Sequence, residues 1–329
     1  MGQTWHVARI AVAALLAAAA VIGPWPPPSS ATAARAATTS CTGRPPQAAR
    51  TMSRSIDHNG FHRTYRLRVP QGYDPRRSTP VVLLLHGQGS YGIIDLLYTD
   101  YGATADRNGF LVVAPDAAYP TWNHWQIDPP PDTLPSGTTD VDPRVDDTGF
   151  VEALLDRVAN RFCVDTHRVF ATGLSSGAFM ASYLACRLPH RIAAVVTVAG
   201  SVYYDQPQCG TGRAVPVLAF HGTADRNVPF DDQRWGAAGP NDGVVPNLRR
   251  WALRRNDCTS ATTVGQLTPA VSTRTWSCPR GQRVRLVRIQ GGGHAWPGAA
   301  YQGPLVDPTD HRVSATTMGW QFFARHPLP

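Results

Sequence analysis

A chain of 329 residues with 43% hydrophobic content can bury the core of one large α/β domain or two small ones, so its composition is that of a globular protein. Its formal net charge of +8 comes from arginine, because the sequence contains no lysine. The arginines are scattered, and no basic run with interleaved aromatic residues occurs, so we expect no nucleic-acid partner.

Residues 1–36 have the pattern of a secretory signal peptide. A basic residue precedes the apolar stretch IAVAALLAAAAVIG, and Ala34 and Ala36 fit a small-x-small cleavage site. The alternative is a membrane span, but the apolar run is too short and several prolines follow it. We therefore expect a secreted, extracellular protein without a membrane partner, in which residues 37–59 form an N-terminal extension and residues 60–329 one domain.

The rest of the chain alternates short apolar runs with helical patterns. The runs PVVLLLHG, GFLVVAPDA, RVFATG, AAVVTVAG, VPVLAFHG and RVRLVRIQGGGH are apolar on both faces, as in a buried parallel sheet. One helical pattern starts beside Asp146 and Asp147, which can cap it, and others pass through residues 245–251 and 313–323. This alternation predicts an α/β fold with a doubly wound, mostly parallel sheet in a single domain.

Two segments interrupt this alternation. Residues 126–145 are rich in Pro, Asp and Thr and too long for a plain connection, which favours a loop that borders a substrate cleft. Their aspartates lack the ligand spacing of an EF-hand, so a solvated loop is favoured over a calcium site. Residues 259–282 are predicted to form a disulfide-bounded hairpin or excursion.

Six cysteines follow residue 40, and an even count in an exported protein predicts three disulfides. Many pairings are possible, and the sequence does not choose among them. We favour three pairs: Cys258 with Cys278, Cys186 with Cys209, and Cys41 with Cys163. No C-x-x-C pair occurs, which argues against zinc, and we expect no metal site.

The stretch RVFATGLSSGAF joins a predicted strand to a predicted helix through a tight turn. Gly173, Ser175 and Gly177 match the pattern G-x-S-x-G, in which a sharp turn holds a serine hydroxyl out of the sheet as a nucleophile. The five-residue pattern also arises by chance, so the interpretation depends on finding an acid and a base later in the chain.

The acid of such a triad follows the serine along the chain, and it must here be an aspartate because the single glutamate, Glu152, precedes Ser175. Asp225 lies in VLAFHGTADRNVPF, at the end of a predicted strand, where catalytic loops gather in open α/β sheets. Asp231 and Asp232 lie farther into the same loop and are less well placed.

His294, His311 and His326 are the candidates for the base. His294 lies in the glycine-rich stretch IQGGGHAWPG after a predicted strand, where the backbone can carry an imidazole back over the sheet edge. His311 and His326 adjoin the last predicted helix, which favours capping or surface positions. We therefore choose His294, which would accept the Ser175 proton while Asp225 orients its imidazole.

Two backbone donors are needed for the oxyanion of the tetrahedral intermediate. The residue after the nucleophile, Ser176, supplies one, and the loop after VVLLLHG supplies the other, with Gln88 as the candidate.

Together, LHG, RVFATGLSSG, FHGTADRNVPF and GGGHAWPG resemble the secreted esterase family of polyhydroxybutyrate depolymerases and feruloyl esterases, over roughly residues 60–326. The resemblance implies an α/β-hydrolase fold and carboxylic ester hydrolysis with no cofactor. It assigns Ser175, Asp225 and His294 to the triad and Gln88 and Ser176 to the oxyanion hole. Many depolymerases carry a cysteine where this chain has Gln88, and we expect no separate polymer-binding domain.

From these observations we expect a monomeric serine esterase acting on feruloyl- or acetyl-type plant cell-wall esters or on soluble hydroxyalkanoate oligomers. Hydrolysis of polyhydroxybutyrate polymer is an alternative, and a peptidase with the same triad stays open. A secreted binding protein on a hydrolase fold is the alternative from another class, although all three triad residues are present. Trp122, Trp125 and Trp296 are candidates for an aromatic substrate platform, with core packing as the equal alternative.

Overall fold

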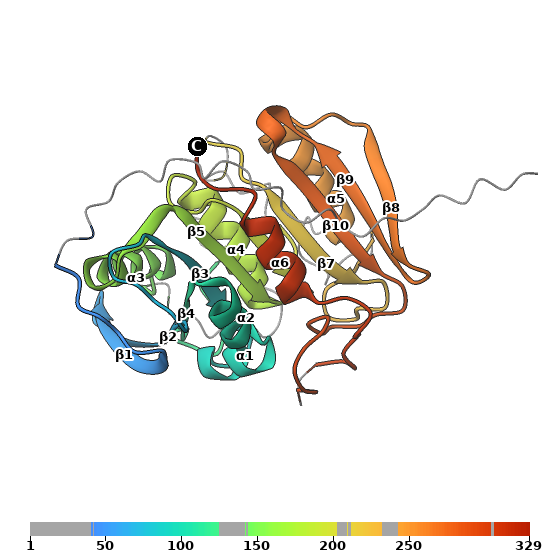
Figure 1. The fold of residues 1–329 in the computed structure, drawn as a ribbon. Coiled ribbons are helices and arrows are strands. Elements are labelled where there is room, and N and C mark those ends of the chain that lie inside the picture. The colour runs from blue at the N-terminus through green and yellow to red at the C-terminus, as the bar shows by residue number, and fades with distance from the viewer. Residues whose placement is uncertain are drawn as a thin grey trace, which may run out of the picture. The chain divides into compact units, whose positions relative to one another are not determined.

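Ten strands of the described chain form one sheet, with the order β1-β2-β4-β3-β5-β6-β7-β10-β9-β8 (Figure 1). The structure is a computed structural model that describes residues 41, 43–124, 142, 144–202, 209, 212–231, 243–303 and 306–329. The strands are β1 (Arg50–His58), β2 (Phe61–Val69), β3 (Thr79–Leu85), β4 (Leu111–Pro115), β5 (Val164–Leu174), β6 (Val195–Val198), β7 (Val217–Gly222), β8 (Thr262–Thr268), β9 (Val271–Ser277) and β10 (Arg283–Ile289).

The six strands from β4 to β10 in the middle of the sheet are parallel, and antiparallel strands extend it at both edges. Strand β3 shows why the centre is stable. Its residues TPVVLLL are all buried, with Val81, Leu83 and Leu85 in the core on one face and Val82 and Leu84 in the core on the other. Each such side chain contributes about 1.5–3 kcal/mol when it is fully buried.

Helices cover both faces of the sheet, so the sheet is doubly wound as the sequence predicts. Helices α3, α4 and α5 pack in the core on one face, and α1, α2 and α6 pack in the core on the other (Figure 1). Their bounds are α1 (Gly92–Tyr98), α2 (Tyr101–Asn108), α3 (Asp147–Arg161), α4 (Ser176–Arg187), α5 (Val244–Arg250) and α6 (Ala315–Phe323); a π-helical turn, Trp251–Arg255, continues α5. Asp146 caps α3 by accepting a hydrogen bond from Gly149 N at 2.8 Å.

One boundary expected from the sequence is wrong. The sequence pattern places residues 50–58 in an N-terminal extension, yet they form β1, which pairs with β2 along its whole length. The signal is weak because β1 is an edge strand, in which only Met52 and Ile56 are buried. The domain therefore includes residues before 60.

The excursion expected at residues 259–282 is a hairpin of β8 and β9, and it adds two antiparallel strands beside β10. The Cys258–Cys278 disulfide closes it. The other disulfides are Cys41–Cys163 and Cys186–Cys209, so all three bonds join the pairs that the sequence favours. Among the residues that the structure describes, no helix combines the length and apolar character needed to cross a membrane.

Candidate active site

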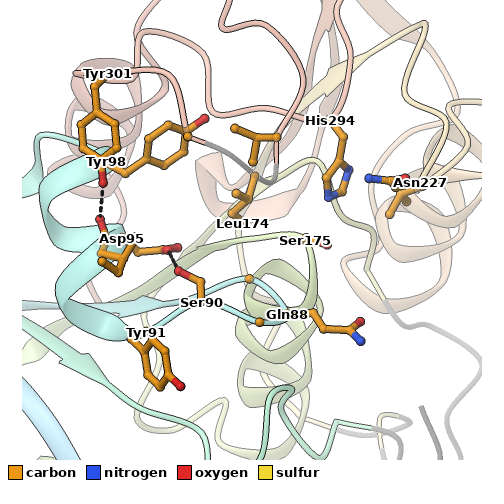
Figure 2. A pocket seen from close by; sticks show the side chains of 16 residues that line it. Gln88, Ser90, Tyr91, Asp95, Tyr98, Leu174, Ser175, Asn227, His294 and Tyr301 are labelled. Atoms are coloured by element: carbon orange, nitrogen blue, oxygen red, sulfur yellow. Dashed lines mark hydrogen bonds between the residues drawn. The ribbon is translucent and has the colours of Figure 1, made fainter. Parts of the chain in front are cut away.

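Four loops meet at one edge of the sheet, because each follows the carboxyl end of a parallel strand. Gln88 follows β3, Ser175 follows β5, Asp225 follows β7 and His294 follows β10. Parallel strands all end at the same edge, so residues far apart in the sequence come together there. Ser175, Gln88 and His294 line one cavity of about 740 Å³ (Figure 2).

Ser175 has a strained backbone at the junction of β5 and α4. Its φ of 53° and ψ of −118° lie in a region that residues with side chains rarely adopt. Such strain costs about 1–3 kcal/mol and persists when the surroundings enforce it. This is the conformation expected of a nucleophile elbow.

The glycine at 177 allows the elbow to pack against β3. A Cβ atom on Gly177 would overlap the backbone carbonyl of Leu85, the last residue of β3. A side chain here would therefore push α4 away from the sheet and move Ser175. The G-x-S-x-G pattern thus has a steric explanation in this chain.

His294 and Asp225 form the second part of the site. The Nδ1 atom of His294 lies 2.9 Å from Oδ2 and 3.1 Å from Oδ1 of Asp225, and both side chains are buried. Because a carboxylate only accepts, Nδ1 carries a proton, so in the neutral imidazole Nε2 is the nitrogen with the lone pair. Figure 2 shows the His294 ring extending toward Ser175.

The Asp225 carboxylate is held by several donors. Oδ1 accepts hydrogen bonds from Asn227 N and Val228 N, both at 2.9 Å. His221 Nε2 donates to Val228 O at 2.8 Å and lies 3.3 Å from Asp225 Oδ2. Burial raises the pKa of Asp225, but hydrogen bonds from His221 and His294 outweigh burial and hold the pKa well below its usual 3.8. Asp225 is therefore a carboxylate at neutral pH.

Close backbone packing brings the acid and the base together. Strands β7 and β10 are neighbours, and a Cβ atom on Gly222 would overlap the carbonyl of Gly292. Ala224 N donates to Gly292 O at 2.8 Å, which joins the two loops. Asp307 then fixes the backbone of His294 through two hydrogen bonds. Asp307 Oδ2 accepts from His294 N at 2.6 Å, and Asp307 N donates to His294 O at 3.0 Å.

The two candidate oxyanion donors have different surroundings. Gln88 lies in the turn of residues 87–90, which is closed by a bond from Ser90 N to Gly87 O at 3.1 Å, while Gly89 N donates to Pro120 O at 2.7 Å. Ser176 is the first residue of α4, where backbone N–H groups have no acceptor within the helix. Its hydroxyl is buried, 2.6 Å from Thr121 Oγ1.

The aromatic platform expected from tryptophan is wrong for the two described residues. Trp122 is fully buried and donates from Nε1 to His86 O at 2.9 Å. Trp296 is fully buried beside Tyr101 and donates to Thr316 Oγ1 at 3.0 Å. Both indoles therefore belong to the core. Trp125 and most of the 126–145 loop lie outside the described residues.

Tyrosine side chains, rather than tryptophans, line the described cavity. Tyr91 and Tyr98 come from α1 and its N-terminal flank, and Tyr301 comes from the segment after His294 (Figure 2). Tyr98 and Tyr301 pack edge to face with ring centroids 5.5 Å apart. The exposed apolar positions Tyr91, Ile94 and Leu97 recur every three residues, a signal that could have identified α1 as a helix with an unusual surface. Within the described ranges, no three His, Cys, Asp or Glu side chains are grouped as metal ligands would be.

Comparison with known proteins finds relatives among the esterases. Residues 63–217 match the family described as Esterase PHB depolymerase. The chain is 28% identical to a putative esterase, NocK, of Nocardia uniformis subsp. tsuyamanensis, over 85% of this chain and 84% of that protein. It is 27% identical to feruloyl esterase D of Neurospora crassa, over 87% of this chain and 90% of that protein.

Solved structures support the fold. The acetyl xylan esterase from Aspergillus awamori superimposes with a TM-score of 0.59 at 14% identity, covering 83% of this chain and 99% of that one. The fold is that of the α/β-hydrolases, with one mostly parallel sheet of ten strands in the described chain and helices on both faces.

Proposed function

Since this chain is a carboxylic ester hydrolase related to the polyhydroxybutyrate depolymerases and feruloyl esterases, we propose that it is a secreted serine esterase with Ser175 as nucleophile, His294 as base and Asp225 as the orienting acid. One observation carries the proposal. His294 Nδ1 is bonded to Asp225 at 2.9 Å, while Ser175 and His294 line the same cavity. Nucleophile, base and orienting group are thus available to one substrate.

The first half of the reaction transfers the acyl group to the enzyme. Ser175 Oγ attacks the ester carbonyl carbon, and His294 Nε2 accepts its proton, so that a C–O bond forms as the carbonyl π bond opens. Asp225 stabilises the imidazolium through Nδ1. The intermediate then collapses, the ester C–O bond breaks, and His294 returns the proton to the leaving alcohol.

The second half releases the acid. Water attacks the acyl-enzyme as His294 accepts its proton, and Ser175 leaves as the hydroxyl when the proton returns. In both halves the negative oxygen would accept hydrogen bonds from the backbone N–H groups of Gln88 and Ser176. Loss of one such donor typically costs about 10²–10³-fold in kcat.

The cavity favours an aromatic acyl group. Its volume of about 740 Å³ lies within the usual range of small-molecule sites, and Tyr91, Tyr98 and Tyr301 offer ring surfaces beside the serine. The relatives include proteins named feruloyl esterase, which supports the same class. We therefore propose plant cell-wall esters of the feruloyl type as substrates, and the smaller acetyl esters fit the same site.

A second candidate is a soluble hydroxyalkanoate oligomer. Tyr91, Ile94 and Leu97 are exposed on one face of α1 and its flank, and Tyr91 and Ile94 also line the cavity. An aliphatic ester chain that leaves the cavity could lie along this apolar face. The match to the family described as Esterase PHB depolymerase supports this candidate.

Secretion is part of the proposal. Three disulfides join the six cysteines, and such bonds persist in oxidising compartments outside the cytosol. Residues 1–36 would be removed as the signal peptide on export.

Hydrolysis of methyl ferulate, of an acetyl ester and of a 3-hydroxybutyrate oligomer by purified secreted protein tests these substrates, with Ser175→Ala as the control. We expect the highest kcat/KM on methyl ferulate. A higher value on the oligomer would favour the second candidate. Equal rates for the wild type and Ser175→Ala on every ester would contradict the proposed mechanism.

A further inference from the structure

A buried carboxyl lies directly beneath the 87–90 turn. Asp95, in the middle of α1, is only 2% exposed, and its Oδ1 atom accepts a hydrogen bond from Ser90 Oγ at 2.7 Å (Figure 2). Its Oδ2 atom has no hydrogen-bond partner within the described residues. Asp95 therefore holds the Ser90 end of the turn that contains Gln88.

The helix that carries Asp95 is itself fixed to the sheet. Gly92 N, at the start of α1, donates to Asp116 Oδ1 at 2.7 Å, and Asp116 directly follows β4. A Cβ atom on Gly92 would overlap the Ala114 carbonyl within β4, so the helix end lies directly against the strand. Asp95 thus links the turn, which contains two glycines, to a helix that is packed against the sheet.

The turn needs such a link because an oxyanion donor works only when its N–H group has the right direction. An oxyanion donor contributes only when its N–H points at the place where the negative oxygen forms. Within the described residues Gln88 N has no hydrogen-bond acceptor, whereas Gly89 N donates to Pro120 O and Ser90 N donates to Gly87 O. The direction of the Gln88 N–H is therefore set by its neighbours.

We propose that Asp95 is a positioning residue for ester hydrolysis, which holds Ser90 so that the Gln88 N–H two residues earlier points at the developing oxyanion. This inference rests on the proposed function. A hydroxyl bonded to a carboxylate makes one of the stronger hydrogen bonds in proteins, so the ionised form of Asp95 holds the turn best.

The surroundings of Asp95 give this contact a pH dependence. Burial raises the pKa of Asp95 to about 7, and the bonds from Ser90 and Gly87 offset only part of that rise. Tyr98 on the same helix and Tyr301 from the facing segment interact with it, and burial raises the pKa of both, so they stay neutral. His86, after β3, stays neutral because burial lowers its pKa. The Asp116 carboxylate, which follows β4, accepts a hydrogen bond from Gly92 N at the start of α1.

Two protonations should therefore reduce activity in acid. His294 must be unprotonated to act as the base, and Asp95 must be ionised to hold the turn. In the wild type, log kcat/KM for methyl ferulate should fall with acid more steeply than a single protonation allows. Asp95→Asn, which keeps the shape but not the charge, should behave at every pH like the wild type with Asp95 protonated, and its acid limb should have a slope of one.

The decisive experiment measures kcat and KM of Asp95→Asn against pH. We expect kcat at about pH 8 to fall about 10–100-fold, the scale of a small misplacement, with KM within about twofold of the wild type. Unchanged kcat and slope would overturn the proposal. A raised KM with unchanged kcat would also overturn it, because Asp95 would then be a substrate contact.

Two further variants separate positioning from stability. Ser90→Ala removes only the hydroxyl that Asp95 holds, so it should lower kcat in the same direction, and it carries the test if Asp95→Asn does not fold. Asp116→Asn weakens the anchoring of α1 but leaves the Ser90–Asp95 hydrogen bond and the Asp95 carboxyl in place, so it should lower the Tm and keep the steep acid limb. Ser175→Ala, assayed in parallel, shows whether the proposed function itself fails.

Discussion

The adjacent serines of the elbow face different surroundings, and this difference predicts how each responds to substitution. Ser175 lines the cavity, whereas the Ser176 hydroxyl is buried against Thr121. Ser175→Ala should lower kcat by about 10⁵-fold or more, because it removes the nucleophile. Ser176→Ala keeps its backbone N–H and should retain kcat within about fivefold of the wild type, while losing about 1 kcal/mol of stability with its buried hydrogen bond.

Steady-state assays with methyl ferulate and thermal unfolding of both variants check this pair. A large loss of kcat in Ser176→Ala, with Ser175→Ala still active, would mean that Ser176 is the nucleophile and Ser175 is not.

At Asp95 the same burial that raises the pKa also affects stability. Between the usual 3.8 and about 7, the folded chain holds a proton that the unfolded chain has released. The free energy of unfolding therefore decreases as the pH rises through this interval, and each pKa unit corresponds to about 1.4 kcal/mol. Above about pH 7 the buried Asp95 carboxylate lowers the free energy of unfolding of the wild type by several kcal/mol at most, relative to the protonated form.

Asp95→Asn removes this titration. Its Tm relative to the wild type should increase from about pH 4.5 to about pH 8, while its kcat decreases as described above. Thermal unfolding followed by circular dichroism at the two pH values measures the difference. The same Tm difference at both values would show that Asp95 does not titrate in this interval.

At the scale of elements, the β8–β9 hairpin extends the sheet away from the cavity. No residue between 259 and 282 lines the cavity, and the Cys258–Cys278 bond closes the hairpin across 20 residues. Replacing both cysteines by serine should cost about 3 kcal/mol of stability, because the unfolded chain gains freedom. The kcat at 25 °C should stay within about twofold of the wild type. Urea unfolding and esterase assays check both parts, and a large loss of kcat would mean that the hairpin supports the site.

The elements that the sequence predicts well are those with a strong local signal. The run PVVLLL is apolar on both faces because β3 is covered by helices on both sides, and the buried residues of the last helix recur at helical spacing. Strand β1 gives little signal, since one face of this edge strand is exposed. Helix α1 has only seven residues and carries apolar side chains on both its buried and its exposed faces, so it has no clear amphipathic pattern.

At the scale of the whole molecule, the positions of Ser175, Asp225 and His294 could be predicted because each follows a recognisable parallel strand, and such strands end at one edge. The cavity wall could not be predicted in this way. Trp122 and Trp296 lie in loops near the site, but their indoles turn into the core, and Tyr98 and Tyr301 meet from segments about 200 residues apart. Side-chain direction depends on packing that no local pattern encodes.

The central claim is that hydrolysis passes through an ester bond to Ser175. Intact-mass measurement during rapid turnover of a feruloyl ester, followed by peptide mapping, tests it most directly. We expect a feruloyl adduct on the peptide that contains Ser175, with no adduct on Ser175→Ala. Full hydrolysis by Ser175→Ala, or an adduct on another residue, would contradict it.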